Sequence, residues 1–308
     1  MKPLILGTRG SALALAQAEM TEQALAKVFP ELEVVRKVIK TTGDRRTDVP
    51  LSEVAKSEGV LDKGVFTKEL EVALEAGKID LAVHSMKDVP TVLGEQFAIT
   101  GALERAPIRD VLLTKNDLGL EGLKEGAVVA TSSVRRQRQL LYLRPDLQLV
   151  DIRGNVPTRI EKLAENPELD AIMLAEAGLV RLGYDMRGEL AAGVYAHALE
   201  PDIFLPAAGQ GIVGFESRVN DHEAAAIAQA ITHEVSMIQC RAEREFLRLL
   251  DAGCHTPVGV HSQMDGDHLA MSACVFDEEN DGPPSEASFA GPVSDPEQVA
   301  AELYAMIV

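Results

Sequence analysis

Short apolar runs alternate with longer amphipathic stretches over the first 100 residues. The short runs, typical of buried strands, are Leu4–Leu6, Leu32–Ile39 and Ile79–Val83. The longer stretches have the apolar spacing of one helix face and cover Ser11–Val28 and Phe66–Ala76. Ser11 is the expected N-cap of the first helix, and Gly77 ends the second. The segment Thr41–Pro50 is expected to be a loop.

The next hundred residues repeat this alternation. Expected strands cover Ala127–Ala130, Leu147–Ile152 and Ala171–Leu174. Expected helices cover Ser133–Leu143, Val156–Ala164 and a stretch that ends at Val180. Strands that alternate with helices are typical of parallel sheets covered by helices on both faces. The stretch Gly183–Leu205 carries scattered Gly and Pro and is expected to be a connector.

The pattern changes from Asp221 onward. A helical period covers Ala224–Leu250, with a break expected near His233. Strands at Val258–Gln263 and Leu269–Phe276, a Pro/Gly/Ser-rich stretch at Asn280–Ser294 and a helix from Asp295 follow. This part of the chain is therefore expected to form a smaller α+β domain.

Composition narrows the class of protein. The chain has 308 residues, 46% of them apolar and 25% charged, which predicts two or three packed domains. No apolar run approaches the roughly 20 residues of a membrane-spanning helix, and the apolar stretch at the start is too short for a signal peptide. Three cysteines argue against a disulfide framework. A cytoplasmic protein is expected.

Charge is unevenly distributed along the chain. The net charge is −18, which argues against non-specific nucleic-acid binding. Residues 131–159, however, hold six arginines against two acids, and residues 221–308 hold sixteen acids against three arginines. A cationic zone in an acidic protein indicates a small polyanionic ligand, and a solvated helix face is the alternative.

Polar side chains follow four of the expected strands directly. They are Arg9 and Ser11; Ser85, Lys87 and Asp88; Thr131, Ser133, Arg135 and Arg136; and Arg153, Asn155 and Arg159. Ligands of open α/β sheets bind beyond the carboxyl ends of the strands, where helix N-termini and Arg side chains attract anions. The sequence predicts two facing anion-binding walls. N-caps and surface salt bridges would explain each position singly, but not their common edge.

Asp88 is an acid among these cations, next to Lys87 and two residues before Pro90. A neighbouring cation keeps a carboxylate charged at neutral pH. Such a carboxylate can move protons or stabilise a developing positive charge. A loop cap is the alternative interpretation.

Two other motifs bear on chemistry. Cys254 lies between Gly253 and His255 in an expected loop, where a thiol is more available than in a core, although a buried structural role is the alternative. No cysteine pair or histidine spacing indicates a metal site. The segment Gly209–Gly214 matches G-x-G-x-x-G but lacks the preceding strand and following helix of a dinucleotide site.

Together these residues resemble the porphobilinogen deaminase family, also called hydroxymethylbilane synthases. The stretches that carry the resemblance are TRGSALALAQ, KGVFTKELEVAL, DLAVHSMKDVPT, VATSSVRRQRQL, DIRGNVPTR, AEAGLVRLG, LPAAGQGIVG and AGCHTPVG. The resemblance implies two α/β domains similar to the type II periplasmic-binding fold plus a smaller α+β domain. The implied limits are 1–103 with 201–220, 104–200, and 221–308.

The resemblance also implies an activity. A transferase of this family joins four porphobilinogen molecules head-to-tail on a dipyrromethane cofactor, here bound through a thioether to Cys254. Ammonia is lost at each addition, and water then releases hydroxymethylbilane for porphyrin and heme biosynthesis. Asp88 would assist loss of the amino group and stabilise the cationic azafulvene. The implied protein is a cytoplasmic monomer with no nucleic-acid or membrane partner.

The growing product carries an acetate and a propionate on each pyrrole, so cationic and neutral donors are expected around it. The resemblance assigns this role to Arg9, Arg135, Arg136, Arg153, Arg159, Arg181, Ser11, Ser85, Lys87, Thr131, Ser133, Asn155, Lys63 and Gln210. Phe66 would stack on a pyrrole, with a helix-core role as the alternative. Glu176 departs from the family pattern and is expected near an arginine clamp.

Two other classes of function compete with this interpretation. A non-catalytic anion-binding protein of the same two-lobed architecture would leave Asp88 and Cys254 without a purpose. A phosphate-handling enzyme would need a phosphate-binding loop of the form G-x-x-x-x-G-K-[ST] or an acidic Mg²⁺ cluster, and the sequence shows neither.

Overall fold

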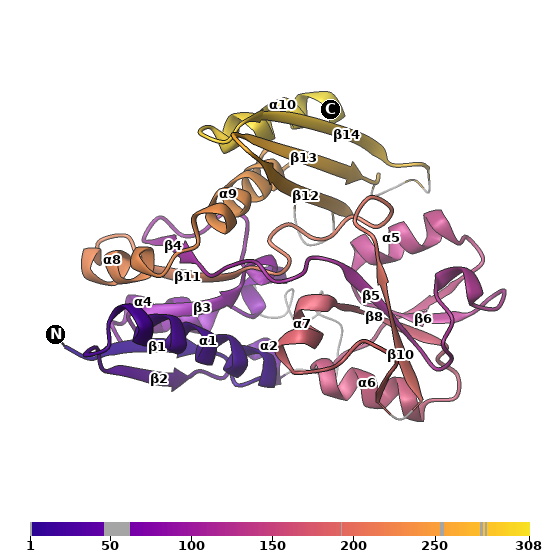
Figure 1. Ribbon diagram of the computed structural model, residues 1–308, viewed down its shortest axis with the longest axis horizontal. Helices are drawn as coiled ribbons and strands as arrows, with labels where there is room; N and C mark the ends of the chain where they lie inside the picture. Colours follow the sequence, from indigo (N-terminus) through magenta and orange to yellow (C-terminus); the bar gives the residue numbers. More distant parts are fainter. Residues whose placement is uncertain (1, 46–61, 192, 253–255, 278–279, 281) are drawn as a thin grey trace.

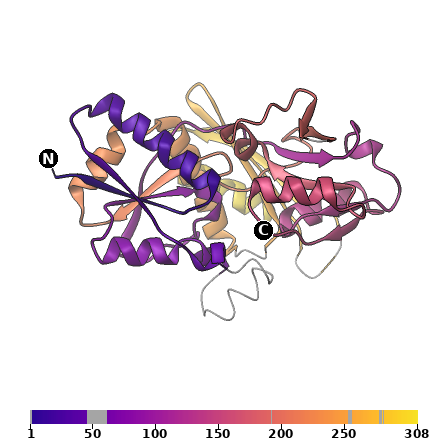
Figure 2. The same ribbon diagram turned by 90° about the horizontal axis from the view of Figure 1, so that it is seen from below.

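Three β-sheets organise the chain in the computed structural model, which describes residues 2–45, 62–191, 193–252, 256–277, 280 and 282–308. The first and second sheets lie side by side with their helices, and the third lies above the junction between them in Figure 1. Figure 2 shows the same two lobes from below, with the third sheet behind them. No helix in these described ranges is long and apolar enough to cross a membrane.

The first sheet has the order β2-β1-β3-β11-β4. Its strands are β1 (Leu4–Thr8), β2 (Val34–Val38), β3 (Leu81–Ser85), β4 (Phe97–Ala102) and β11 (Val213–Arg218). Its helices and helical turns are α1 (Ala12–Val28), α2 (Thr42–Arg45), η1 (Asp62–Val65), α4 (Lys68–Glu75), η2 (Met86–Asp88) and α8 (His222–Ala230). Strand β11 returns from beyond the second sheet and pairs antiparallel with β3 and β4.

Local signals explain the boundaries of the helices around this sheet. The Ser11 hydroxyl accepts a hydrogen bond from the Ala14 N–H at 3.2 Å, which confirms the expected N-cap of α1. Gly77 follows α4 with a φ of +62°, a left-handed conformation that favours glycine. Leu6, Leu25 and Phe215 are fully buried between the sheet and its helices.

The second sheet has the order β7-β6-β8-β5-β10-β9. Its strands are β5 (Asp110–Thr114), β6 (Val128–Ala130), β7 (Gln148–Val150), β8 (Ala171–Ala175), β9 (Glu189–Ala191) and β10 (Val194–Leu199). Its helices are η3 (Leu120–Gly122), α5 (Val134–Leu143), α6 (Val156–Glu165) and α7 (Glu176–Arg181). Leu112 and Leu113 are fully buried on opposite faces of β5, so helices cover both sides of this sheet.

The third sheet is an antiparallel meander in the order β12-β13-β14. Its elements are α9 (Glu234–Leu249), β12 (Val258–Asp265), β13 (His268–Val275), β14 (Ser285–Pro292) and α10 (Pro296–Ile307). His233 separates α8 from α9 and caps α9 through Ser236, as the expected break required. Asp295 caps α10 through the Gln298 N–H.

The expected fold class is confirmed, with two α/β lobes and a smaller α+β unit. Several local expectations were wrong. Both large sheets are mixed rather than parallel. In the first sheet β11 runs antiparallel to β3 and β4, and in the second sheet β5 runs antiparallel to β8 and β10. The expected connector Gly183–Leu205 contains β9 and β10, and the expected loop Thr41–Pro50 begins with α2.

The stretch Asn280–Ser294 also hides a strand. Strand β14 has the sequence SEASFAGP, in which small residues mask the alternation that marks a strand. Its eight residues pair in register with β13 from His268↔Pro292 to Val275↔Ser285. Long-range pairing therefore decided this element against its weak local signal.

Candidate functional site

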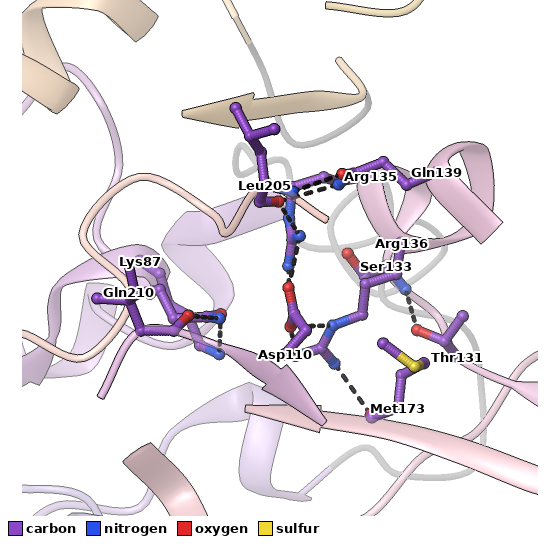
Figure 3. Close-up of polar contacts among 11 residues, drawn as sticks. Lys87, Asp110, Thr131, Ser133, Arg135, Arg136, Gln139, Met173, Leu205 and Gln210 are labelled. Atoms are coloured by element: carbon purple, nitrogen blue, oxygen red, sulfur yellow. Dashed lines mark hydrogen bonds and ion pairs between the residues drawn. The ribbon is translucent and has the colours of Figure 1, made fainter. Parts of the chain in front are cut away.

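The two lobes meet where the turn after β3 faces a crossover segment and the start of α5 (Figure 3). Lys87, in the turn η2, points its Nζ at Oε1 of Gln210, 3.3 Å away. Gln210 in turn donates from Nε2 to the Ile108 carbonyl oxygen at 2.7 Å. The crossover that leads into β11 is thereby linked to the segment that leads into β5.

The G-x-G-x-x-G segment, Gly209–Gly214, allows the crossover backbone to lie close to the turn η2. A Cβ on Gly209, whose φ is +69°, would lie 2.9 Å from Cβ of Met86 and 3.3 Å from the Lys87 nitrogen. A Cβ on Gly214 would lie 2.1 Å from Sδ of Met86. These glycines let the backbone pass against the turn that carries Lys87 and Asp88, which gives the motif a packing role.

Arg135 and Arg136, in the first turn of α5, share one buried carboxylate. Asp110 is fully buried; its Oδ2 lies 2.7 Å from Nη1 of Arg135, and its Oδ1 lies 2.8 Å from Nε of Arg136. The two arginine side chains are each about 7% exposed. Burial alone would raise the pKa of Asp110, but the two guanidinium groups outweigh it and hold that pKa far below its usual range.

Backbone carbonyls complete the arginine pair. Arg135 donates from Nη1 to the Leu205 carbonyl oxygen at 2.6 Å, and Arg136 donates from Nη1 to that of Met173 at 3.0 Å. Gln139, one turn further along α5, donates to the same Leu205 oxygen and accepts from the Leu205 N–H (Figure 3). The arginine wall of the second lobe is therefore fixed to the crossover segment.

Burial lowers the pKa values of the cations in this region. The pKa of Lys87 falls to about 8 because the side chain is desolvated and Arg136 lies near, although Asp88 and Asp110 counteract this. Burial, with Arg136 and Arg153, lowers the pKa of Arg159 to about 10, and Asp88 opposes it. The site thus brings Asp88 together with cations from both lobes, as the strand-end pattern predicted.

Arg159 and Arg181 have no carboxylate within ion-pair distance in the described ranges of the chain. Arg159 donates from Nε to the Gly154 carbonyl oxygen at 2.7 Å. Arg181 donates from Nη2 to the Gly211 carbonyl oxygen at 2.6 Å, while burial lowers its pKa to about 10. Both side chains stay charged at neutral pH and are therefore suited to binding external carboxylates.

Some other predicted ligand residues have local partners. Ser11 and Asn155 cap α1 and α6 with their side-chain oxygens. The Ser85 hydroxyl accepts from Nε2 of Gln17 at 2.8 Å. The Thr131 hydroxyl accepts from the Ser133 N–H at 3.3 Å, and the Ser133 hydroxyl makes no capping hydrogen bond.

Arg9 lies over the ring of Phe66, with its guanidinium carbon 4.2 Å from the ring centroid. Gly43 makes room for this ring, because a Cβ there would lie 2.3 Å from Cε1 of Phe66. Cys254 and the side chain of Lys63 fall outside the described part of the structure. Their predicted roles, and stacking of Phe66 on a pyrrole, stay predictions.

Glu176 was expected near an arginine clamp, and the structure assigns it a different partner. Both of its carboxylate oxygens accept from Arg109, at 2.7 and 2.9 Å, and Arg109 also contacts Glu200 at 2.9 Å. The side-chain hydrogen bonds to Glu176 raise the pKa of Arg109. Glu176 is thus neutralised beside the site rather than competing for Arg181.

Sequence reasoning missed two buried acids. Asp110 stands at the start of the apolar run Val111–Leu113, where a lone acid in a buried strand signals a paired charge. Glu243, in α9, is fully buried and accepts from Arg105 at 2.6 Å, from the Gly209 N–H at 2.7 Å and from the Ser262 hydroxyl at 2.6 Å. It therefore connects two segments that run between the lobes, the one from β4 to β5 and the one from β10 to β11, to the third sheet.

Most of the chain matches one protein family. A family model described as "Porphobilinogen deaminase, dipyromethane cofactor binding domain" matches residues 4–226, and "Porphobilinogen deaminase, C-terminal domain" matches residues 237–308. A curated porphobilinogen deaminase of Chlorobium chlorochromatii is 44% identical over 89% of this chain and 83% of its own. That of Chlorobaculum tepidum is 45% identical over the same shares.

Solved structures show weaker likenesses. The periplasmic aliphatic sulphonate binding protein SsuA of Escherichia coli has a TM-score of 0.44 at 15% identity, over 82% of this chain and 71% of that one. The periplasmic VFT2 domain of Bordetella pertussis BvgS has a TM-score of 0.42 at 14% identity, over 74% and 86%. The family models, which together match most of the chain, are decisive: this chain belongs to the porphobilinogen deaminase family.

Proposed function

We propose that this chain is a transferase that joins four porphobilinogen molecules head-to-tail and, after hydrolysis, yields hydroxymethylbilane. Each addition releases ammonia. Family membership and 44–45% identity to curated porphobilinogen deaminases support this activity. The observation on which the residue roles rest is the cluster of cations around Asp88, drawn from both lobes.

The buried donors suit a dipyrromethane cofactor, which carries four carboxylates. Nε of Arg135 and Nε of Arg181 are buried and have no acceptor in the part of the chain that the structure describes. Arg159 and Arg181 use only backbone carbonyls there. Buried, unsatisfied N–H donors are costly unless a ligand accepts from them. Bound through Cys254, the group would supply the primer to which pyrroles are added.

Asp88 is proposed as the catalytic residue. Its loop is held in place because Arg244, on α9, donates to the carbonyl oxygens of Pro90 and Thr91 at 2.8 and 3.0 Å. Met86 packs in a buried cluster with Val89 below the same turn. A carboxylate fixed in this way can shuttle protons to the departing amine and stabilise positive charge on the substrate pyrrole.

The surrounding cations are proposed to bind the acetate and propionate groups of the substrate. Lys87 approaches from the first lobe, and Arg136 and Arg159 approach from the second. With Arg135 these four positive charges face the negative charges of Asp88 and Asp110. The cations outnumber the carboxylates in this region, and this excess of positive charge suits the acetate and propionate groups of the substrate.

We propose three domains and a monomeric, cytoplasmic enzyme. The first domain takes in β11 and also α8, because Ala224 and Ile227 of α8 pack in the first core. The third domain would then begin after Ala230 rather than at residue 221. Support for the cytoplasm is the sparse cysteine content, with Cys240 and Cys274 buried as free thiols.

The test is the intact mass of the purified protein beside a Cys254→Ser variant. We expect the native chain to exceed its calculated mass by one dipyrromethane, and the variant to show none. Incubation with porphobilinogen should then add mass in single pyrrole steps to the native chain alone. A native chain that gains no mass under either condition would overturn the transferase and favour a passive anion-binding protein.

A further inference from the structure

Asp110 occupies an unusual position for an acid. It begins β5 in the middle of the second sheet, between β8 and β10, and it has no exposed surface. Its partners are two arginines that stand next to each other on α5 (Figure 3). A buried carboxylate is retained at a cost in desolvation, which two charge-assisted partners offset.

Consecutive helix residues point about 100° apart, so Arg135 and Arg136 do not converge by helix geometry alone. Their like charges also repel each other in a buried setting. Asp110 Oδ1 lies 2.6 Å from Nη2 of Arg136 and 3.3 Å from Nη2 of Arg135, so one oxygen contacts both guanidinium groups. This shared acceptor holds the two side chains together.

Asp110 also determines which N–H groups of the two arginines are already hydrogen-bonded within the protein. Arg135 donates from Nη1 and Nη2 to Asp110 and from Nη1 to the Leu205 carbonyl oxygen, and its buried Nε has no acceptor among the residues that the structure describes. Arg136 pairs with Asp110 through Nε and Nη2 and donates from Nη1 to the Met173 carbonyl oxygen. Each guanidinium group has five N–H bonds, so a limited and defined set remains for a ligand.

We infer that Asp110 is a positioning residue for carboxylate binding, because it holds Arg135 and Arg136 in one arrangement and so sets which of their N–H groups can bind a substrate carboxylate. This inference rests on the proposed function. It assigns Asp110 no contact with the substrate itself.

The charge of Asp110 reaches a third cation. The groups that face Lys87 are Asp88 on its own turn, Arg135 and Arg136 from α5, and Asp110 from β5; the uncharged Gln210 accepts from it. Asp110 raises the pKa of Lys87, whereas the two arginines lower it. Removal of the Asp110 charge would leave Asp88 as the single carboxylate among these groups to oppose the arginine repulsion, so Lys87 would lose its proton at lower pH.

Three variants separate charge from position. Asp110→Asn keeps the shape and removes the charge, whereas Asp110→Glu keeps the charge and displaces it by one methylene. Asp146→Asn is the matched control, because Asp146 pairs with Arg144 in the same sheet domain and accepts from the Gly126 N–H, on a more exposed surface.

The first readout needs no turnover. The rate of Lys87 acetylation is followed by peptide mass spectrometry as a function of pH, since only the neutral amine reacts. We expect the Lys87 titration to move down by about two pH units in Asp110→Asn, as for loss of one charge several ångströms away at an effective dielectric constant of about 20. Asp110→Glu and Asp146→Asn should titrate as the native chain does.

The second readout is steady-state kinetics with porphobilinogen. Asp110→Glu should raise KM about tenfold or more, the effect of losing one charge-assisted hydrogen bond, while kcat changes less. A Lys87 titration and a KM in both Asp110 variants equal to those of Asp146→Asn would overturn the inference. If Asp110→Asn does not fold, Asp110→Glu decides by KM alone. If the native chain shows no turnover while the Lys87 titration still shifts in Asp110→Asn, the result counts against the proposed function and not against the role of Asp110.

Discussion

Lys87 gives the sharpest pH dependence that the structure predicts. Its pKa is about 8 in the free protein, mainly because burial disfavours the charged amine. The group is a base with a lowered pKa, so the charge needed to bind a carboxylate is present below pH 8 and lost above it. The perturbation is therefore a rise in pH from 7 to 9.

The expected magnitude follows from that value. About nine-tenths of the molecules carry the Lys87 charge at pH 7 and about one-tenth carry it at pH 9. The ratio kcat/KM for porphobilinogen reports the free enzyme, so it should fall about tenfold over this range. A bound carboxylate stabilises the charged amine and raises its pKa. The alkaline fall in kcat should therefore lie at higher pH than the alkaline fall in kcat/KM.

The assay compares the alkaline limb of kcat/KM in the native chain, Lys87→Arg and Lys87→Met. Arginine keeps its charge, so its limb should move upward by more than one pH unit, and methionine should show a low value with no limb near pH 8. Titration of the substrate itself is common to all three and cancels. An alkaline limb at the same pH in the native chain and Lys87→Arg would refute the assignment.

The same shift has a consequence for stability. The folded-state pKa of Lys87 lies below the ordinary lysine value of 10.5, so the protonated amine disfavours folding below about pH 8. This cost is relieved as pH rises from about 8 towards 10.5. It is the usual behaviour of a buried cation that is kept for binding rather than for stability.

Two further predictions concern single carboxylates. Asp88→Asn should lower kcat about a hundredfold or more and leave the thermal unfolding midpoint unchanged, because Asp88 acts on charge that develops in the reaction; unchanged kcat in steady-state assays would remove it from the mechanism. Glu243→Gln should lower the free energy of unfolding by about 3–5 kcal/mol in urea titrations, since it leaves the buried Arg105 charge without its partner; Glu297→Gln, whose partner Arg241 is exposed, is the control and should change it by less than about 1 kcal/mol.

Glu243 also bears on how the lobes are held. It contacts Arg105 in the segment from β4 to β5, Gly209 in the segment from β10 to β11, and Ser262 in β12. Arg105 extends this link by donating from Nε to the Gln210 carbonyl oxygen at 2.9 Å. Gln210, which accepts a hydrogen bond from Lys87, is thus linked to the third sheet through the buried Arg105–Glu243 ion pair.

The sequence by itself determined the local elements with strong patterns and the type of chemistry. Ser11 was predicted as an N-cap, His233 as a helix break and Asp295 as a helix start. All three side chains accept from a backbone N–H three residues further on, so the signal lies in the neighbouring residues. Arg135, Arg136 and Asp88 were predicted to belong to one site, because strand ends and helix starts place polar side chains at one edge of a sheet. The family followed from the same stretches.

Tertiary structure alone decided what these side chains do before a ligand arrives. Asp110 is 25 residues from Arg135, and Lys87 is 123 residues from Gln210, so no local pattern could pair them. The strand β14 and the antiparallel return of β11 likewise depend on partners elsewhere in the chain. The physical reason is burial, which arises only when the lobes assemble. Burial lowers the pKa values of Lys87 and Arg159, and a bound carboxylate would stabilise their charged forms.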